Sequence, residues 1–194
     1  MRSSPARLSM RAASSRDRLG LLAAAIALCL VACDLKIDPL RTTPAAQEQI
    51  DAIKAGQLVG RATVIDGDTL VVRGQRVRLW GVDALESGQK CKNQYGQTWL
   101  CGKDAAMFLS LYIGPRTVLC EPRGTSYDRV VARCTVAGTD LGAWTVRKGW
   151  ALDYARYSKG LYSADESQAR TAGIGMHQGA HEAPWDWRKA KRTP

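Results

Sequence analysis

Three β-rich runs follow one another in the chain after residue 56. They cover residues 57–65, 69–73 and 75–80, and each is rich in Val, Leu, Ile or Thr. The last two runs meet at Gly74-Gln75, where glycine permits the positive φ of a tight hairpin turn. The pattern predicts an antiparallel meander of three strands.

The third run also alternates in polarity. Because successive side chains of a strand point to opposite faces, Arg76, Arg78 and Trp80 should share one face. Val77 and Leu79 should share the other. One face of this strand is therefore expected to be apolar, and the opposite face to present arginines to a ligand.

Three segments further on have helical spacing. The apolar residues of the first follow an i, i+3, i+4, i+7 pattern, namely Ala105, Phe108, Leu109 and Tyr112. A second helix is predicted over residues 140–148 with Gly149 just beyond its end. A third is predicted to open with the capping-box pattern of residues 163–166 and to end near Gly173.

Two more β-rich runs, near residues 117–120 and 129–136, flank a predicted turn at 125–128 and should form a hairpin. Three strands, a helix, two strands and two helices is an α+β order. It predicts a five-stranded β-barrel decorated with three helices.

The cysteines after residue 33 are even in number, at positions 91, 101, 120 and 134. Cys120 and Cys134 are expected to face each other across the predicted hairpin, which leaves Cys91 to pair with Cys101. A four-cysteine zinc site is the alternative, but the spacings lack a Cys-x-x-Cys element. Two disulfides fit an exported protein better.

The N-terminus has the organisation of an export signal. A basic, Ser-rich stretch through Arg18 precedes residues 19–33, which carry no charge and are shorter than the roughly 20 residues of a membrane span. The segment ends Leu30-Val31-Ala32-Cys33, which resembles the lipobox of bacterial lipoproteins. We expect a signal peptide over residues 1–32, starting at Met1 or Met10, and a lipid on Cys33.

This export signal predicts a protein of the cell envelope, anchored to a membrane by its lipid and facing the periplasm or the cell surface. An ordinary cleaved signal is the alternative. Residues 33–56 are polar and contain prolines, so they should form a flexible tether with a helical turn near residues 46–55. The folded domain is expected over residues 57–176, followed by a tail over 177–194 in which both histidines lie at the surface.

The net charge favours a polyanionic partner. The chain has 28 basic and 18 acidic residues, and removing five Arg and one Asp of the first 32 residues leaves 23 and 17, an excess of six positive charges. Such an excess favours nucleic acid or an acidic membrane surface and says nothing of chemistry.

Acidic and basic residues with chemical potential cluster around the first three predicted strands. Asp66-Gly67-Asp68-Thr69 occupies the turn between the first two, where Gly67 should let the chain reverse. Alone, this turn is better explained as an Asx-type turn capped by a hydroxyl group. Arg78, Asp83 and Glu86 follow on and just after the third strand, which points to a shared site.

Four blocks in order resemble the signature of the staphylococcal nuclease (thermonuclease) family. They are Asp66–Thr69, Arg78–Glu86, Tyr127–Ala132 and Gly149–Ala151. The similarity covers residues 57–176, and the tail sequence Pro184–Arg188 also resembles that of secreted bacterial members. The resemblance implies an OB-fold barrel with three helices, a scaffold that often binds oligonucleotides.

The same resemblance implies a Ca²⁺ site made of oxygen ligands. Asp68 and Asp83 match the two metal-binding carboxylates of the family. The carbonyl of Ala84 matches a further ligand, and Asp66 matches an outer carboxylate that acts through water. Oxygen ligands are those that calcium prefers.

The resemblance also assigns catalytic and substrate-binding residues. Arg78 and Arg129 match two phosphate-binding arginines, and Glu86 matches the residue usually assigned as general base. Tyr127 matches a phosphate-contacting tyrosine. Tyr157 matches a tyrosine that stacks on a base, and Tyr154 is the alternative candidate for this position.

Three departures from the family pattern are Leu85, Asp128 and Met176. Asp128 is expected either to orient Arg129 or to compete with phosphate for it.

The implied activity is Ca²⁺-dependent hydrolysis of DNA and RNA with little sequence preference, leaving 3′-phosphate ends, by a monomer without a protein partner. The alternatives are a non-catalytic nucleic-acid-binding OB module and a structural lipoprotein of the envelope. Replacing Arg78 or Arg129 with Ala should remove several kcal/mol of transition-state stabilisation with little effect on folding.

Overall fold

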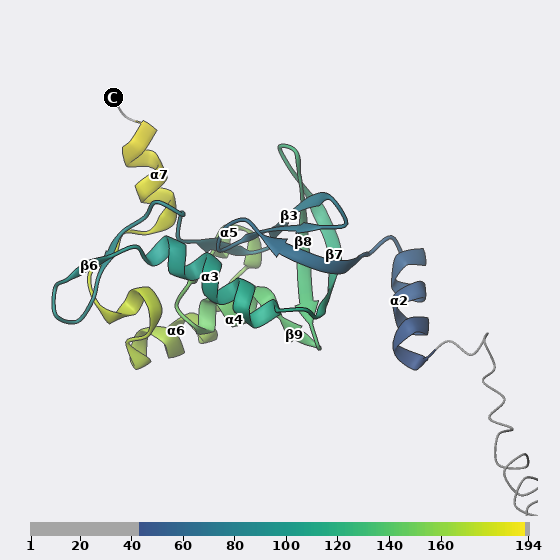
Figure 1. Cartoon of the computed structure of the whole chain (residues 1–194). Helices are drawn as coiled ribbons and strands as arrows, with labels where there is room; N and C mark the ends of the chain where they lie inside the picture. The colour runs from purple at the N-terminus through teal and green to yellow at the C-terminus, as the bar shows by residue number, and fades with distance from the viewer. Residues whose placement is uncertain (1–42, 193–194) are drawn as a thin grey trace, which may run out of the picture. The chain divides into compact units, whose positions relative to one another are not determined.

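The computed structural model describes residues 43–192 (Figure 1). Five strands make a closed barrel: β1 (Leu58–Val64), β2 (Thr69–Val72), β3 (Gln75–Leu79), β7 (Thr117–Ser126) and β8 (Arg129–Val136). They are hydrogen-bonded in the order β3-β2-β1-β7-β8, and a parallel pairing of β3 with β8 closes the barrel. The predicted α+β barrel is confirmed.

The alternation predicted for the third strand determines how the barrel is filled. Val77 and Leu79 point inward and are almost completely buried, together with Leu70 of β2 and Val118 of β7. Arg78, between them in the chain, lies on the opposite face of the strand and pairs in register with Thr69. The packing of the apolar face thus directs Arg78 to the outside of the barrel.

The three predicted helices are present as α3 (Cys101–Ile113), α4 (Leu141–Arg147) and α6 (Ser163–Ala172). The Asp140 carboxylate accepts the N–H of Ala143 at the start of α4, and Gly149 follows its end with φ +69°. The structure adds four elements: α2 (Pro44–Lys54), α5 (Ala155–Ser158), the 3₁₀ helix η1 (Gly175–Gln178) and α7 (Pro184–Arg192). Both ends of the described chain are therefore more helical than predicted.

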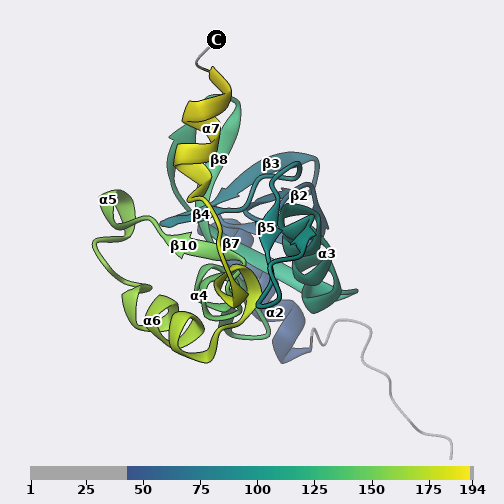
Figure 2. The ribbon, with the colours of Figure 1, turned by 90° about the vertical axis from the view of Figure 1, so that its left-hand side faces the viewer.

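Short strands attach further segments to the barrel. β4 (Val82–Ala84) pairs with β10 (Ala151–Asp153), β5 (Cys91–Lys92) with β6 (Thr98–Trp99), and β9 (Thr139–Asp140) with β8. A second apolar cluster, including Leu85, Trp150 and Met176, packs the loop after β4 against the chain beyond α6. Figure 2 shows α7 at the opposite side of the view from α4 and α6. No helix within residues 43–192 has the length and apolar character needed to cross a membrane.

Both predicted disulfides are confirmed. Cys120 and Cys134 lie opposite each other in the register of β7 and β8 and are bonded. Cys91 of β5 is bonded to Cys101 at the start of α3. The second bond ties the loop after β4 to the helix beside it.

Several local predictions were wrong. The β2–β3 turn consists of Arg73 and Gly74, both with positive φ, one residue earlier than expected. The capping box does not form, because Ser163 Oγ donates to the carbonyl of Gly160 and Glu166 accepts the N–H of Asp153. By contrast, the helical turn predicted near residues 46–55 is present as the helix α2, which covers Pro44–Lys54.

Candidate active site

The acidic turn between β1 and β2 is closed by its own side chains. Asp66 Oδ1 accepts the N–H of Asp68 at 3.0 Å, and the Thr69 hydroxyl donates to Asp68 Oδ1 at 3.1 Å. Gly67 does not have a positive φ. A Cβ on Gly67 would lie 2.7 Å from Ala84 Cβ, so the glycine is needed for close approach to β4 and not for chain reversal.

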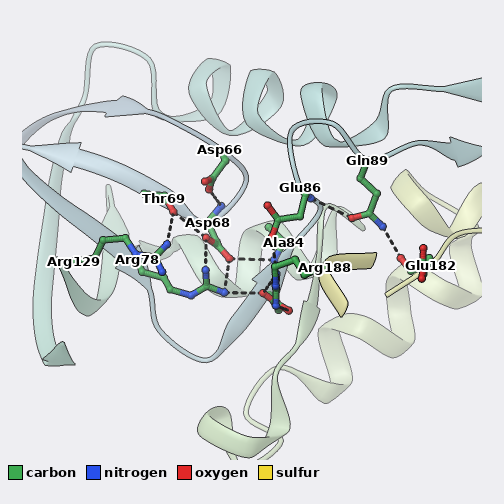
Figure 3. A network of polar contacts seen from close by, with 11 residues as sticks. Asp66, Asp68, Thr69, Arg78, Ala84, Glu86, Gln89, Arg129, Glu182 and Arg188 are labelled. Carbon is green, nitrogen blue, oxygen red and sulfur yellow. Dashed lines mark hydrogen bonds and ion pairs between the residues drawn. The ribbon is translucent and has the colours of Figure 1, made fainter. Parts of the chain in front are cut away.

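Arg78 joins this turn to β4. Its Nη2 lies 2.9 Å from Asp68 Oδ2 and 2.7 Å from Asp83 Oδ1, so one nitrogen bridges the two predicted metal-binding carboxylates. The N–H of Ala84 donates to the second oxygen of Asp68 at 3.2 Å. Four predicted site residues from separate parts of the chain therefore meet in one hydrogen-bonded cluster (Figure 3).

Burial determines the protonation behaviour of this cluster. It raises the pKa of Asp68 to about 7; the positive charge of Arg78 opposes this shift, and the carboxylates of Asp66 and Asp83 add to it. Burial also acts to lower the pKa of Arg78, but Asp68 and Asp83 more than compensate, so the pKa rises above its ordinary value. Arg78 is a fixed positive charge in a site with an excess of carboxylates.

Glu86 lies beside this cluster and is held by residues that the sequence did not point to. Arg188 of α7 donates to Glu86 Oε1 at 2.7 Å and to both oxygens of Asp83 at 3.0 and 2.6 Å. The N–H of Glu86 donates to Gln89 Oε1, and Gln89 Nε2 donates to the carbonyl of Glu182 at 2.7 Å (Figure 3). The chain leading into α7 is thus tied to the loop that carries Glu86.

Gly102, in the first turn of α3, also fixes this loop. A Cβ at position 102 would lie 1.7 Å from the carbonyl oxygen of Glu86, so any larger residue would push the loop outward. Gly102 precedes the helical spacing that begins at Ala105, and glycine is the residue that permits such a close approach of two backbone segments. The tail sequence Pro184–Arg188 resembles that of secreted family members, but the resemblance assigns no role to Arg188.

Arg129 lies at the rim of the same site. It donates to the Thr69 hydroxyl at 3.4 Å, and through Thr69 it is linked to Asp68. Asp128 does not contact it as predicted, because its carboxylate pairs with Arg76 at 3.1 Å. Arg129 therefore has a weaker set of contacts than Arg78.

A cavity of about 660 Å³ opens beside these residues. Glu86, Arg78 and Arg129 line it, with the β7–β8 hairpin end on one side and α7 on the other. The predicted substrate-binding residues also line it: Tyr127, which is 94% exposed at the hairpin turn, and both candidates for stacking, Tyr154 and Tyr157. Asp68 and Asp83 are not among its lining residues.

The ligands that the family resemblance implies for Ca²⁺ lie around Asp68 and Asp83. Within residues 43–192, no three His, Cys, Asp or Glu side chains are grouped so as to hold a metal by themselves. Asp68 and Asp83 nevertheless share Arg78 Nη2, and the backbone of Ala84 lies against Asp68. Two buried carboxylates suit a hard cation that completes its shell with water and phosphate oxygens, and the Ala84 group in contact with Asp68 is the backbone N–H. Cys33, the predicted lipid site, lies outside the described residues.

The two histidines of the tail are not surface residues as predicted. His177 lies in η1 and is half-buried, its Nε2 has no hydrogen-bond partner in the described structure, and its ring is 5.1 Å from that of His181. Burial and the charges of His181 and Arg170 lower the pKa of His177 to about 4. The segment between the domain and α7 is therefore packed, not merely connecting.

Comparison with known proteins gives one family and two relatives. A family model described as staphylococcal nuclease homologue matches residues 76–178. The succinoglycan biosynthesis protein ExoI of Rhizobium meliloti (strain 1021) is 38% identical over 129 residues, 65% of this chain and 68% of that protein. An uncharacterized 38.1 kDa protein of Capnoides sempervirens is 28% identical over 131 residues, 66% of this chain and 36% of its own length.

Proposed function

The chain belongs to the family of staphylococcal nuclease homologues, and on this premise we propose that it is a Ca²⁺-dependent nuclease. Its substrates would be DNA and RNA, cut with little sequence preference to leave 3′-phosphate ends. The observation that carries the proposal is the bridging of Asp68 and Asp83 by one nitrogen of Arg78, beside Glu86 and a cavity rimmed by Arg129.

The proposed metal ligands are Asp68, Asp83 and the carbonyl of Ala84, with Asp66 acting through water. When bound, a divalent cation supplies positive charge for the phosphate oxygens. Asp83 now accepts hydrogen bonds from Arg78 and Arg188, so these contacts must be shared or rearranged when the cation binds.

Three side chains are proposed to act directly in the hydrolysis of the phosphodiester bond. Attack of water on phosphorus forms one P–O bond and breaks the bond to the 5′ oxygen, so the products are a 3′-phosphate and a 5′-hydroxyl. Glu86 takes a proton from the attacking water, and the departing 5′ oxygen takes up a proton from solvent to become the hydroxyl. Arg129 and Arg78 stabilise the negative charge that grows on the phosphate oxygens, with guanidinium groups that stay ionised.

Tyr127 and Tyr157 are proposed to contact the substrate. Tyr127 is fully accessible at the hairpin turn, within reach of a phosphate at the rim of the cavity. Tyr157 is 54% exposed and can offer its ring to a base.

A second candidate function is binding without cleavage. It is favoured by Arg188, which neutralises the two carboxylates that catalysis would need, Asp83 and Glu86. A nucleic-acid-binding module with a closed, charge-balanced barrel end would have this arrangement.

The deciding experiment incubates the purified protein with single-stranded DNA, duplex DNA and RNA, with Ca²⁺ and then with excess chelator. Cleavage that requires Ca²⁺, leaves 3′-phosphate ends and is lost in Glu86→Gln and Asp83→Asn is the expected result. Asp51→Asn, which removes the same charge from the exposed face of α2, is the matched control and should keep full activity. Cleavage in chelator would contradict the metal site, and binding without cleavage would establish the second candidate.

We also propose that the protein is exported and held in the cell envelope by a lipid on Cys33. The support is the sequence Leu30–Cys33 after an uncharged segment. Mass spectrometry of the mature N-terminus tests this directly, since a lipidated Cys33 as first residue is expected, and an unmodified residue beyond position 33 would contradict it.

A further inference from the structure

We propose that α7 forms one wall of a binding groove for a single nucleic-acid strand, next to the site of cleavage. This inference rests on the proposed function and assigns a substrate-binding role to a segment that the sequence predicted to be a tail. The wall is defined as Trp185, Arg188, Lys189 and Arg192, all of which line the cavity.

The placement of α7 is fixed by the active-site residues themselves. A helix of nine residues is marginal in water by itself, so its position depends on tertiary contacts. Arg188 pairs with Asp83 and Glu86, and the Trp185 ring stacks on Tyr154 with centroids 5.7 Å apart and planes at 15°. The wall is therefore attached at the proposed reaction centre and not to a remote part of the barrel.

The charges of the cavity favour a polyanion longer than one phosphate. Its lining contains five basic side chains, Arg78, Arg129, Arg188, Lys189 and Arg192, and one acidic side chain, Glu86. Arg188 is engaged by Asp83 and Glu86, and Lys189 and Arg192 follow it in α7 and line the same cavity. Positive charges concentrated in a groove attract the phosphates that follow one another along a strand.

The aromatic side chains favour an unpaired strand over a duplex. Tyr154 and Tyr157 line the same cavity as the wall, with ring centroids 5.2 Å apart, and Tyr157 is more than half exposed. The exposed ring of Tyr157 can stack on a base only where that base is not already stacked within a duplex, whereas the Tyr154 ring is stacked on Trp185. Basic and aromatic groups that line one cavity are the combination that binds single strands.

The shape of the molecule is consistent with this use. Figures 1 and 2 show α7 and the end of the β7–β8 hairpin projecting from the same end of the barrel. The cavity is lined by residues 125–127 of the hairpin and by α7, and its volume of about 660 Å³ far exceeds one phosphate group. A strand can therefore extend from Arg129 toward Arg192.

The test measures binding in excess chelator, where no cleavage is expected. Fluorescently labelled oligothymidylates of increasing length are titrated with the full chain at several KCl concentrations. The variant carries Lys189→Gln and Arg192→Gln, and the control carries Arg61→Gln and Lys148→Gln, two exposed positions outside the cavity with the same change in charge. Circular dichroism verifies that both are folded.

The expected result is a weaker Kd for long oligonucleotides in the wall variant and a smaller salt dependence. Each phosphate contact on a single strand contributes about 0.7 to the slope of log Kd against log salt, so loss of two contacts lowers the slope by about 1.4. The control should keep the slope of the parent protein. Duplex DNA should bind more weakly than a single strand of equal length.

An unchanged slope of log Kd against log salt in the wall variant would contradict the proposed role of α7. Tighter binding of duplex DNA than of a single strand by the parent protein would also contradict it. If the parent cleaves DNA with Ca²⁺ while the wall variant binds like the parent, the inference fails and the nuclease stands. If binding depends on the wall but no cleavage occurs with Ca²⁺, the wall stands and the proposed catalysis fails.

Discussion

Asp83 lies between two regions that are held in place by different forces. On one side it accepts hydrogen bonds from Arg78, which is part of the closed barrel, and on the other from Arg188, which is part of the C-terminal segment after residue 174. Asp83 itself is fully buried, so both arginines neutralise a charge that water does not reach.

The barrel region is built from strand pairing and burial. Arg78 sits in a strand that is paired on both sides, to β2 and to β8, and its neighbours Val77 and Leu79 are core residues. Moving Arg78 would require opening the barrel.

The C-terminal region is built mainly from side-chain contacts. Met176 anchors η1 in the second core, Gln89 ties the chain at Glu182, and Arg188 holds α7. Opening α7 breaks these contacts and leaves the barrel closed. The comparison indicates that one half of the site is rigid and the other can open locally at a lower free energy.

The largest effect is expected for Arg78→Ala. It removes activity and leaves the Asp68 carboxylate without its ion-pair partner, so the free energy of unfolding should fall by about 3 kcal/mol or more. The ion pairs of Arg78 therefore lead us to expect a larger effect on folding than the sequence alone suggested. Urea denaturation measures it, with Arg76→Ala as control, because Arg76 pairs with Asp128 at the surface. Equal losses in both variants would contradict a structural role for Arg78.

Arg129→Ala should separate catalysis from stability. Its hydrogen bond to Thr69 is long, so the free energy of unfolding should change by less than about 0.5 kcal/mol. The rate of cleavage should fall by about 100- to 1000-fold, the usual loss for one electrostatic donor. A large loss of stability would show that the two arginines are not as different as their contacts indicate.

Arg188→Ala should affect the C-terminal region alone. Loss of its charged hydrogen bonds should speed amide exchange in residues 184–192 by about tenfold or more, measured by mass spectrometry. Strands of the barrel should keep their protection, since Asp83 retains Arg78. Arg147→Ala, which breaks an exposed pair with Asp165, is the control. Faster exchange throughout the barrel would contradict the proposed independence of the two regions.

The smallest effect concerns pH. Because the pKa of His177 is lowered to about 4 from its ordinary 6.5, the unfolded chain binds a proton between these values that the folded chain does not. The free energy of unfolding should therefore fall as pH decreases through this window, and His177→Gln should remove that part of the loss.

Urea denaturation at pH values between about 7 and about 4 tests this prediction. The raised pKa of Asp68 acts in the opposite direction, so the difference between variant and parent isolates His177. Identical pH profiles would show that His177 does not titrate as inferred. His181, Arg170 and Glu166 are the charged groups that contribute to its pKa.

Much of the barrel region could be predicted from the sequence because its signals are local. Alternation over residues 75–80 assigned Val77 and Leu79 to the core, and pairing across one hairpin assigned Cys120 to Cys134. The helical spacing of apolar residues from Ala105 to Tyr112 correctly predicted α3. Predictions of which partner a polar side chain chooses were less successful. Asp128 pairs with Arg76 and not with Arg129, and the Ser163 hydroxyl donates to the carbonyl of Gly160 instead of forming the predicted capping box.

The sequence by itself determined the five strands of the barrel, which cysteines can meet, and that carboxylates and arginines occur in the order of a known nuclease family. It could not determine that Arg188 lies against Asp83, 105 residues earlier, or that Gln89 accepts the N–H of Glu86 while binding the chain at Glu182. Such contacts leave no periodic pattern in the sequence, because they join residues far apart in the chain that only the packing of the tail against the barrel brings together.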